Sequence, residues 1–368
     1  MNRHQELGWN CKLLHCSGFL SYLSPVVQNY ILQADLITVQ RNVIDPQIIE
    51  AMRYFLGLGK PIAIDLDDAY HILPWSNPAH RFWKVRDDIY TGDLSAISQF
   101  EQPESSENGK LRGAALHYLE DGLRLTQALI APNRNLLADW QHVCRGYYLQ
   151  NYAETGWWNN LPSRAELKQE RGLQDKIIIG WGGSVSHIDS WYGSGIFEAT
   201  ERISRRHSNV VWLICGNDSR IHQALPVPYD QKLIQPGVPP EQWPRSVKTF
   251  DIGVAPLFGI YDQRRSWIKG MEYSLAGTPW AGTGGEVYRD LGDTGTLVPN
   301  GVDAWEMAIE RLINNLEKEQ ATMEARIPEA QQRFLVDNNL DKFERVYRQV
   351  IADFQGMGQP VLPGVVRL

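Results

Sequence analysis

The stretch that decides the fold is Ile177-Ile178-Ile179-Gly180-Trp181-Gly182-Gly183-Ser184, where an apolar run passes directly into a cluster of glycines. Such a run is typical of a buried parallel strand, and glycines after it let the backbone turn sharply into a helix. Backbone N–H groups at such a turn can approach an anion, and a following helix N-terminus adds a favourable partial charge. Gly182, Gly183 and Ser184 are therefore candidates for binding an anionic group. The alternative is a tight turn that needs glycine only for its backbone geometry.

The glycine spacing also excludes two familiar nucleotide sites. It matches neither the GxGxxG fingerprint nor the Walker P-loop, so a dinucleotide or Mg-ATP site of those kinds is disfavoured.

Short apolar runs and longer stretches of helical period alternate along the whole chain, which predicts an α/β fold with parallel sheets. We expect strands in the first half at residues 12–15, 36–40, 61–65, 128–131 and 147–150, and helices at 25–33, 46–58, 111–124 and 133–140. In the second half we expect strands at 177–180, 210–215, 233–235, 252–255, 279–281 and 296–298, and helices at 191–206, 240–249, 266–276, 287–291, 303–316, 318–335 and 341–354. Residues 153–175 have little strand character and separate two α/β domains. The polar stretch 70–110 is long enough to be a functional lid or partly disordered.

Composition narrows the class of protein. The 368 residues suffice for two domains, and the net charge of −7 without a long basic run argues against a nucleic-acid partner. Four scattered cysteines form neither a disulfide framework nor a closed zinc site. The sequence has no apolar run of membrane-spanning length and no signal-peptide core at its start. We therefore expect a cytoplasmic protein, and attachment to a membrane surface remains compatible with this.

A second group of polar residues occurs in the stretch from Arg264 to Tyr273. Arg265, Lys269 and Glu272 are spaced four and three residues apart, so a helix beginning there would place them on one face. Two cations and one carboxylate on one face are suited to a diphosphate and a ribose. The alternative is a solvated face on which these charges pair with each other.

The stretch from Lys269 to Gly285, K-G-M-E-Y-S-L-A-G-T-P-W-A-G-T-G-G, resembles the donor-site signature of family 4 glycosyltransferases. The resemblance extends over about residues 176–316 and includes the glycine loop with His187 and Asp189. It implies a GT-B fold, with two Rossmann-like domains whose parallel sheets face a central cleft. It further implies a nucleotide-sugar donor, with Glu272 on the ribose and with Arg265, Ser266, Lys269 and the loop Gly284–Gly285 near the diphosphate. His187 becomes a candidate catalytic residue.

The first half contributes three acidic residues at the end of an apolar strand, in the sequence Pro61-Ile62-Ala63-Ile64-Asp65-Leu66-Asp67-Asp68. Carboxylates at the carboxyl ends of parallel strands face the crevice where ligands bind. The family resemblance places this segment on the acceptor side, where Asp67 or Asp68 would orient or deprotonate an acceptor hydroxyl. Two alternatives remain open, a metal-binding DxD motif of a GT-A transferase and a structural role in capping the next turn.

The sequence departs from the family pattern in two places. Arg264 stands eight residues before Glu272, where the family has a first glutamate, so the resemblance does not assign the transferred sugar. The usual first strand, glycine loop and helix are also missing around residues 5–8, which predicts a reduced N-terminal domain or one completed by a partner chain.

The resulting prediction is a GT-B transferase that moves a sugar from a nucleotide-diphosphate donor to an unidentified glycan, lipid or protein acceptor. We expect a reduced acceptor-side domain at 1–152, a donor-binding domain at 153–335, and a C-terminal helix and tail at 336–368 that returns to the first domain. The reaction would need neither metal nor cofactor, and the resemblance implies retention of anomeric configuration. The rival readings are a non-catalytic nucleotide-sugar or glycan-binding subunit and a nucleotide-sugar epimerase of the same fold.

Overall fold

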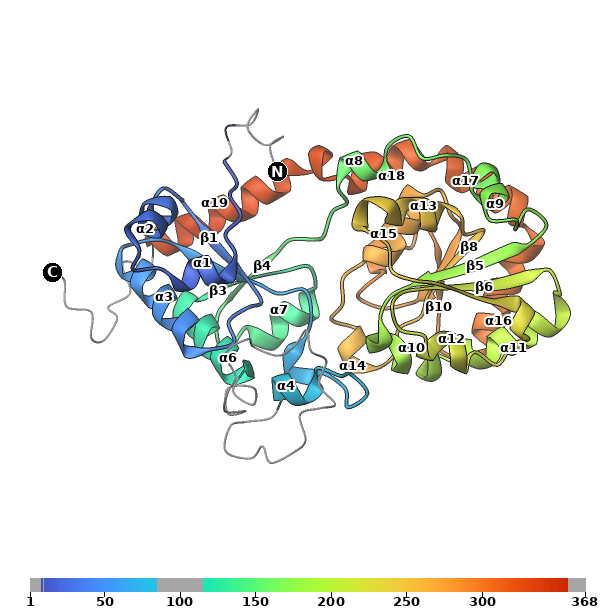
Figure 1. The fold of residues 1–368 in the computed structure, drawn as a ribbon, viewed down its shortest axis with the longest axis horizontal. Helices are drawn as coiled ribbons and strands as arrows, with labels where there is room; N and C mark the ends of the chain where they lie inside the picture. Colours follow the sequence, from blue (N-terminus) through green and yellow to red (C-terminus); the bar gives the residue numbers. More distant parts are fainter. Residues whose placement is uncertain (1–7, 9, 85–114, 357–368) are drawn as a thin grey trace. The chain divides into compact units, whose positions relative to one another are not determined.

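The computed structural model describes residues 8, 10–84 and 115–356. Most of the stretch 70–110, expected to be a lid or partly disordered, lies outside these residues. So do the start of the helix expected at 111–124, residues 5–7 and the tail after 356. The chain divides into two compact units, Met1–Gln150 together with Leu340–Leu368, and Asn151–Asn339. Each unit contains one parallel sheet (Figure 1).

The sheet of the first unit has four parallel strands in the order β1-β2-β3-β4. They are β1 (Ile37–Gln40), β2 (Ile62–Asp65), β3 (Ala128–Ala131) and β4 (Arg145–Tyr148). The helices are α1 (Cys16–Leu20), α2 (Pro25–Leu32), α3 (Pro46–Gly57), α4 (His80–Lys84), α6 (Ala115–Thr126) and α7 (Arg134–Trp140), with the 3-10 helix η2 (Tyr70–Ile72). Strands β2 and β3 are apolar and buried, as expected for strands inside a parallel sheet.

The strand expected at 12–15 is wrong. Residues 12–15 are irregular, and helix α1 begins directly after them with the His15 ring accepting a hydrogen bond from the Ser17 N–H. The run Lys12-Leu13-Leu14-His15 contains two adjacent leucines, but none of the described strands pairs with it, and β1 remains the edge of the sheet.

Helix α19 (Leu340–Gly356) packs in the first unit although it comes last in the chain. The Asp353 carboxylate accepts a hydrogen bond from the Tyr147 hydroxyl at 2.8 Å and pairs with Arg145 at 2.9 Å, both on strand β4. These contacts attach the end of the chain to the edge of the four-stranded sheet.

The second unit has six parallel strands in the order β10-β9-β8-β5-β6-β7. They are β5 (Ile177–Gly182), β6 (Val210–Cys215), β7 (Lys232–Gln235), β8 (Ile252–Ala255), β9 (Trp280–Thr283) and β10 (Thr296–Val298). The order reverses between β5 and β8, which are neighbours in the sheet but distant in sequence. Ligands of open α/β sheets bind at the carboxyl ends of strands at such a reversal.

Helices cover both faces of this sheet (Figure 1). One face carries α10 (Ile188–Gly193), α11 (Ile196–Arg206), α12 (Arg220–Ala224) and α16 (Val302–Asn314), and the other carries α13 (Trp243–Lys248), α15 (Ile268–Leu275), α17 (Leu316–Ala325) and α18 (Ile327–Phe334). The remaining short elements are α8 (Thr155–Trp158), α9 (Arg164–Glu170), α14 (Gly259–Asp262), η5 (Val185–His187), η6 (Tyr229–Gln231), η7 (Pro240–Gln242), η8 (Arg289–Leu291) and η9 (Val336–Asn338).

Strand β5 supplies side chains to both hydrophobic cores. Ile179 and Trp181 belong to the core under α11 and α16, whereas Ile178 belongs to the core under α15 and α18. This alternation follows from the period of two along a strand. The helix expected at 191–206 is two helices, because Gly195 adopts a positive φ of 87° between α10 and α11.

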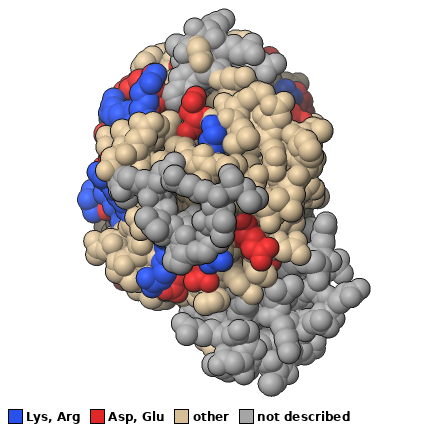
Figure 2. Space-filling model, turned by 90° about the vertical axis from the view of Figure 1, so that its left-hand side faces the viewer, with Lys and Arg blue, Asp and Glu red and all other residues tan. Residues whose placement is uncertain are grey.

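Over the part of the surface that Figure 2 colours, charged side chains of both signs lie in small groups, some with opposite charges side by side, and uncharged surface lies between the groups. None of the described helices combines the length and the apolar character needed to cross a bilayer.

Candidate functional site

Two cations of the second unit converge on one histidine. His187 ends η5 in the loop after β5, Arg265 lies in the loop before α15, and Lys269 is in the first turn of α15. The Nε2 atom of His187 lies 3.0 Å from Nη1 of Arg265 and 3.2 Å from Nζ of Lys269. Two residues that the sequence predicts to share a site, Arg265 and Lys269, therefore both contact the third, His187.

The His187 ring between these cations is neutral. Its side chain is buried, and burial together with the charges of Arg265 and Lys269 holds its pKa well below the ordinary value of 6.5. Both cations only donate hydrogen bonds, so Nε2 must accept with its lone pair. The two cations thus share an uncharged acceptor. An anionic ligand would be a stronger acceptor for both of them.

The structure corrects the predicted position of Arg265. It does not lie on the helix with Lys269 and Glu272, because α15 begins at Ile268 with Trp267 as its N-cap. Instead, Arg265 follows α14, and its Nε donates to the Asp262 carboxylate at 2.7 Å. The neighbouring Ser266 is partly buried between Arg265 and the start of the helix.

Lys269 and Glu272 are one turn apart on α15, as the sequence predicts. The Lys269 ammonium also lies over the Trp181 ring, 5.5 Å from its centre, in a cation–π contact. Burial raises the pKa of Glu272 from 4.5 to about 7, although a hydrogen bond with Trp243 and the charge of Lys269 act in the opposite direction. An acidic side chain whose pKa is raised this far by burial is typical of a functional position.

The glycines after Ile179 make room for aromatic side chains. A Cβ atom on Gly180 would lie 2.1 Å from the Phe250 ring, and one on Gly182 would lie 2.1 Å from the Trp243 ring. The Gly183 N–H donates to the Cys215 carbonyl at 3.0 Å, so this amide already has a partner in the sheet. Close packing therefore accounts for part of the motif, and Ser184 remains the exposed member of the loop.

The second glycine pair lies where β9 ends. The Gly284 N–H donates to the Val298 carbonyl at 2.9 Å, and Gly285 has a φ of 149°, which L side chains rarely adopt. A Cβ on Gly285 would meet the Gln263 amide at 2.4 Å. Gln263 lies two residues before Arg265, so this loop and the loop that carries Arg265 are in contact.

The acidic group of the first unit follows β2. The exposed Asp67 accepts a hydrogen bond from the Tyr70 hydroxyl at 3.1 Å, while Asp68 is partly buried. Asp65, the first of the three acids, ends the strand, and burial together with the charge of Asp67 raises its pKa to about 6. Nearby, the His71 ring pairs with Asp139 at 2.9 Å. These residues belong to the first unit, whereas the His187 cluster belongs to the second.

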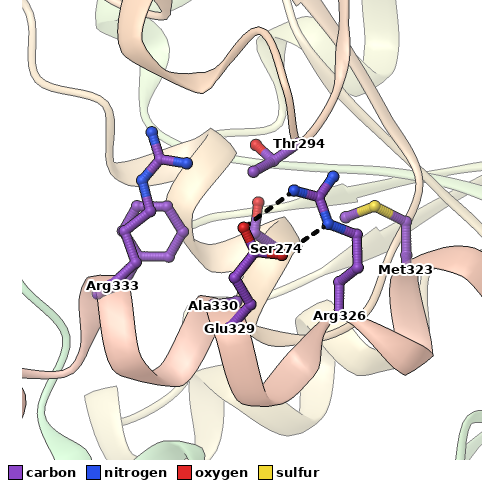
Figure 3. A pocket seen from close by; sticks show the side chains of 8 residues that line it. Ser274, Thr294, Met323, Arg326, Glu329, Ala330 and Arg333 are labelled. Carbon is purple, nitrogen blue, oxygen red and sulfur yellow. Dashed lines mark hydrogen bonds and ion pairs between the residues drawn. The ribbon is translucent and has the colours of Figure 1, made fainter.

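The described residues contain no group of three or more His, Cys, Asp or Glu side chains arranged to hold a metal ion. A small hollow beside α15 lies apart from the predicted site and is lined by Ser274, Arg326 and Arg333 (Figure 3). Arg326 pairs with Glu329 at 3.0 Å and Arg333 with Asp293 at 2.9 Å, so carboxylates already compensate both cations.

Sequence reasoning missed the residues that hold the cluster in place. Asp262 and Ser190 are both buried and bonded to each other, at 2.5 Å between Ser190 Oγ and the carboxylate. The spacing of three between Asp262 and Arg265 was the available signal, since an acid and a base at that spacing pair within one turn. Ser190 gave no signal, because only the fold brings it beside a residue 72 positions away.

Comparisons with known proteins identify the fold. No protein-family model matches the sequence, and no curated protein matches it significantly. Among solved structures, the chain is similar to HepE from Anabaena in complex with UDP and glucose, with 14% identity, a TM-score of 0.57, and coverage of 90% of this chain and 83% of the other. A glycosyltransferase from Rickettsia africae gives 14% identity and a TM-score of 0.57, with coverage of 93% and 84%.

A sucrose-phosphate synthase from Thermosynechococcus elongatus gives 12% identity and a TM-score of 0.54, with coverage of 93% of this chain and 81% of the other. These likenesses and the two parallel-sheet units agree. The chain therefore has the GT-B fold of glycosyltransferases.

Proposed function

We propose that this protein is a glycosyltransferase that uses a nucleotide-diphosphate sugar as its donor. The observation that carries the proposal is the convergence of Arg265 and Lys269 on the neutral ring of His187 at the carboxyl end of β5. This is the strand-order reversal of the six-stranded sheet, where ligands of such folds bind. The similar HepE structures contain UDP or UDP-glucose, which supports a donor of this class.

In this proposal the two cations bind the diphosphate. Arg265 and Lys269 would donate to phosphate oxygens, which are charged and therefore stronger acceptors than the His187 lone pair. Glu272 lies one turn beyond Lys269 and would accept hydrogen bonds from the ribose hydroxyls. Ser184 and the loop Gly284–Gly285 would border the same ligand. His187 would then face the group that leaves or is transferred.

Catalysis would rest on positioning and on charge stabilisation. The departing diphosphate develops negative charge, and preorganised cations lower the energy of that state without a metal ion. The sugar would pass to an acceptor that Asp67 and Asp68 bind or deprotonate, with retention of anomeric configuration. We also propose a cytoplasmic location. Asp67 and Asp68 follow β2 at the carboxyl edge of the four-stranded sheet, the edge at which parallel sheets of this kind bind ligands.

The test measures affinity for nucleoside diphosphates and for the matching nucleosides by calorimetry. Thermal-shift screening of UDP, GDP and ADP first selects the base, because a ligand at 100 times its Kd stabilises by about 2.7 kcal/mol. Arg265→Ala and Lys269→Ala should each weaken diphosphate binding by about 1.5–3 kcal/mol, since each loses a charged hydrogen bond. Nucleoside affinity should stay unchanged, because the nucleoside has no phosphate.

Arg264→Ala is the matched control. It removes an adjacent arginine whose Nη1 binds the Ile260 carbonyl rather than His187. Equal losses for diphosphate and nucleoside, or equal losses in the control, would contradict the assignment. Release of nucleoside diphosphate with sugar transfer to an acceptor then separates an enzyme from a binding subunit, and an isomerised sugar formed without an acceptor would indicate an epimerase.

A further inference from the structure

We propose that Asp262 is the positioning residue of this site, holding Arg265 and, through Ser190, the ring of His187. The inference deepens the proposed function and rests on it for its ligand, but its geometry is present in the protein alone. Four side chains form a closed ring of contacts, His187–Ser190–Asp262–Arg265–His187.

The Asp262 carboxylate is buried, and both of its oxygens accept hydrogen bonds. One oxygen accepts from Arg265 Nε at 2.7 Å, and the other accepts from the Ser190 hydroxyl at 2.5 Å and the Phe258 N–H at 2.7 Å. The charge of Arg265 compensates the buried carboxylate, and removing either partner of such a pair leaves the other charge uncompensated. Asp262 therefore fixes the direction in which the guanidinium points.

The guanidinium is held on its other sides as well. It lies over the Tyr261 ring at 4.7 Å, and its Nη2 donates to the Ser186 carbonyl at 3.1 Å. With Nε on Asp262, the planar fork places Nη1 at His187. A lysine has a single donor atom and would not serve Asp262 and His187 with the same geometry.

The ring of contacts also decides which nitrogen of His187 carries the proton. Ser190 has one hydroxyl hydrogen and gives it to Asp262, so its oxygen can only accept from His187 Nδ1, 3.5 Å away. On the other side, Arg265 and Lys269 have donors only, so Nε2 must be unprotonated. Both sides independently place the proton on Nδ1 and leave the Nε2 lone pair toward the cations.

The first test reads the His187 ring by nitrogen NMR in the ligand-free full chain, with the signal assigned by its loss in His187→Gln. In the wild type we expect a neutral ring protonated on Nδ1 at neutral pH. Asp262→Asn should raise the pKa of His187, because the released Arg265 no longer faces Nε2. The sign is decisive, since losing a nearby negative charge without moving Arg265 would lower the pKa.

If Asp262→Asn does not fold, Arg265→Lys tests the same proposal. This variant should fold, because the lysine leaves a cation beside the buried Asp262 carboxylate. It should also raise the pKa of His187. The control is Asp251→Asn, which removes another buried carboxylate, bound to Lys168 at 2.7 Å, and should leave the ring unchanged. A proton on Nε2 in the wild type, or an unchanged or lowered pKa in a folded Asp262→Asn or Arg265→Lys protein, overturns the proposal.

The second test is a double-mutant cycle on binding of the nucleoside diphosphate selected by the thermal-shift screen. Asp262→Asn should weaken binding about tenfold in the wild type and have no further effect in Arg265→Ala, because it acts through that arginine. Additive losses would contradict positioning. If no nucleoside diphosphate binds while the NMR result holds, the proposed donor fails and the positioning role of Asp262 stands.

Discussion

Glu272→Gln offers a test in which stability and function should change in opposite directions. Burial raises the pKa of this side chain from 4.5 to about 7 in the folded protein. A folded-state pKa above the unfolded value means that ionised Glu272 destabilises the fold. The stability linked to this group is therefore complete below about pH 4.5 and is lost as the pH rises through 7.

The size of the effect follows from the pKa difference. One pKa unit corresponds to about 1.4 kcal/mol, so the change from 4.5 to about 7 corresponds to at most about 3 kcal/mol. Glutamine has nearly the same shape but never ionises. Relative to the wild type, Glu272→Gln should gain stability between about pH 5 and pH 7 and reach a plateau near pH 8, while donor affinity falls.

Urea unfolding followed by tryptophan fluorescence at pH 5, 6, 7 and 8 measures this difference in the free energy of unfolding. Comparing variant with wild type at each pH cancels the titration of all other groups. Glu317→Gln on α17 is the control, because its exposed charge lies in water. A stability difference that stays constant from pH 5 to 8, or a wild type that is the more stable protein at pH 8, would refute the reasoning.

Two further predictions concern the metal and the acceptor. Turnover should persist in EDTA, because Arg265 and Lys269 would carry the diphosphate charge; loss of turnover on chelation with recovery in Mn²⁺ or Mg²⁺ would instead favour a metal site at Asp65–Asp68. Asp68→Asn, and to a smaller extent Asp67→Asn because Asp67 is exposed and bonded to Tyr70, should slow single-turnover transfer by about 10²–10⁴ if the group is the base. Donor titration in the same variants should be unchanged, and full transfer rates in both would exclude the pair.

The alternating pattern of strands and helices could be predicted because it depends on local periodicity. Strand β6 (Val210–Cys215) and helix α3 (Pro46–Gly57) show the expected signals, a fully apolar run and an Asp45 cap before proline. The strand expected at 12–15 failed because pairing with a neighbouring strand is not encoded locally. The sheet order, with β5 beside β8, likewise depends on the whole unit.

The site could be predicted only in part. The choice of Arg265, Lys269 and His187 came from sequence, and the structure places them in contact. The expectation of one shared helical face was wrong for Arg265, because Asp262 holds it in the loop before Trp267 caps the helix. Trp243 contacts Glu272 across a long sequence separation, and Ser190 bonds to Asp262, 72 positions away, so no local pattern could indicate these contacts.

The place of α19 has a consequence for how the protein is made. Because Leu340–Leu368 belongs with Met1–Gln150, the first unit is discontinuous in sequence, while Asn151–Asn339 is one uninterrupted segment. During synthesis on the ribosome, the second unit can complete its sheet before the first has received its last helix. The bonds from Asp353 to Tyr147 and Arg145 then close the first unit only after the whole second unit has been made. Truncation before Leu340 should therefore expose the edge of β4 to proteases and leave the six-stranded unit resistant.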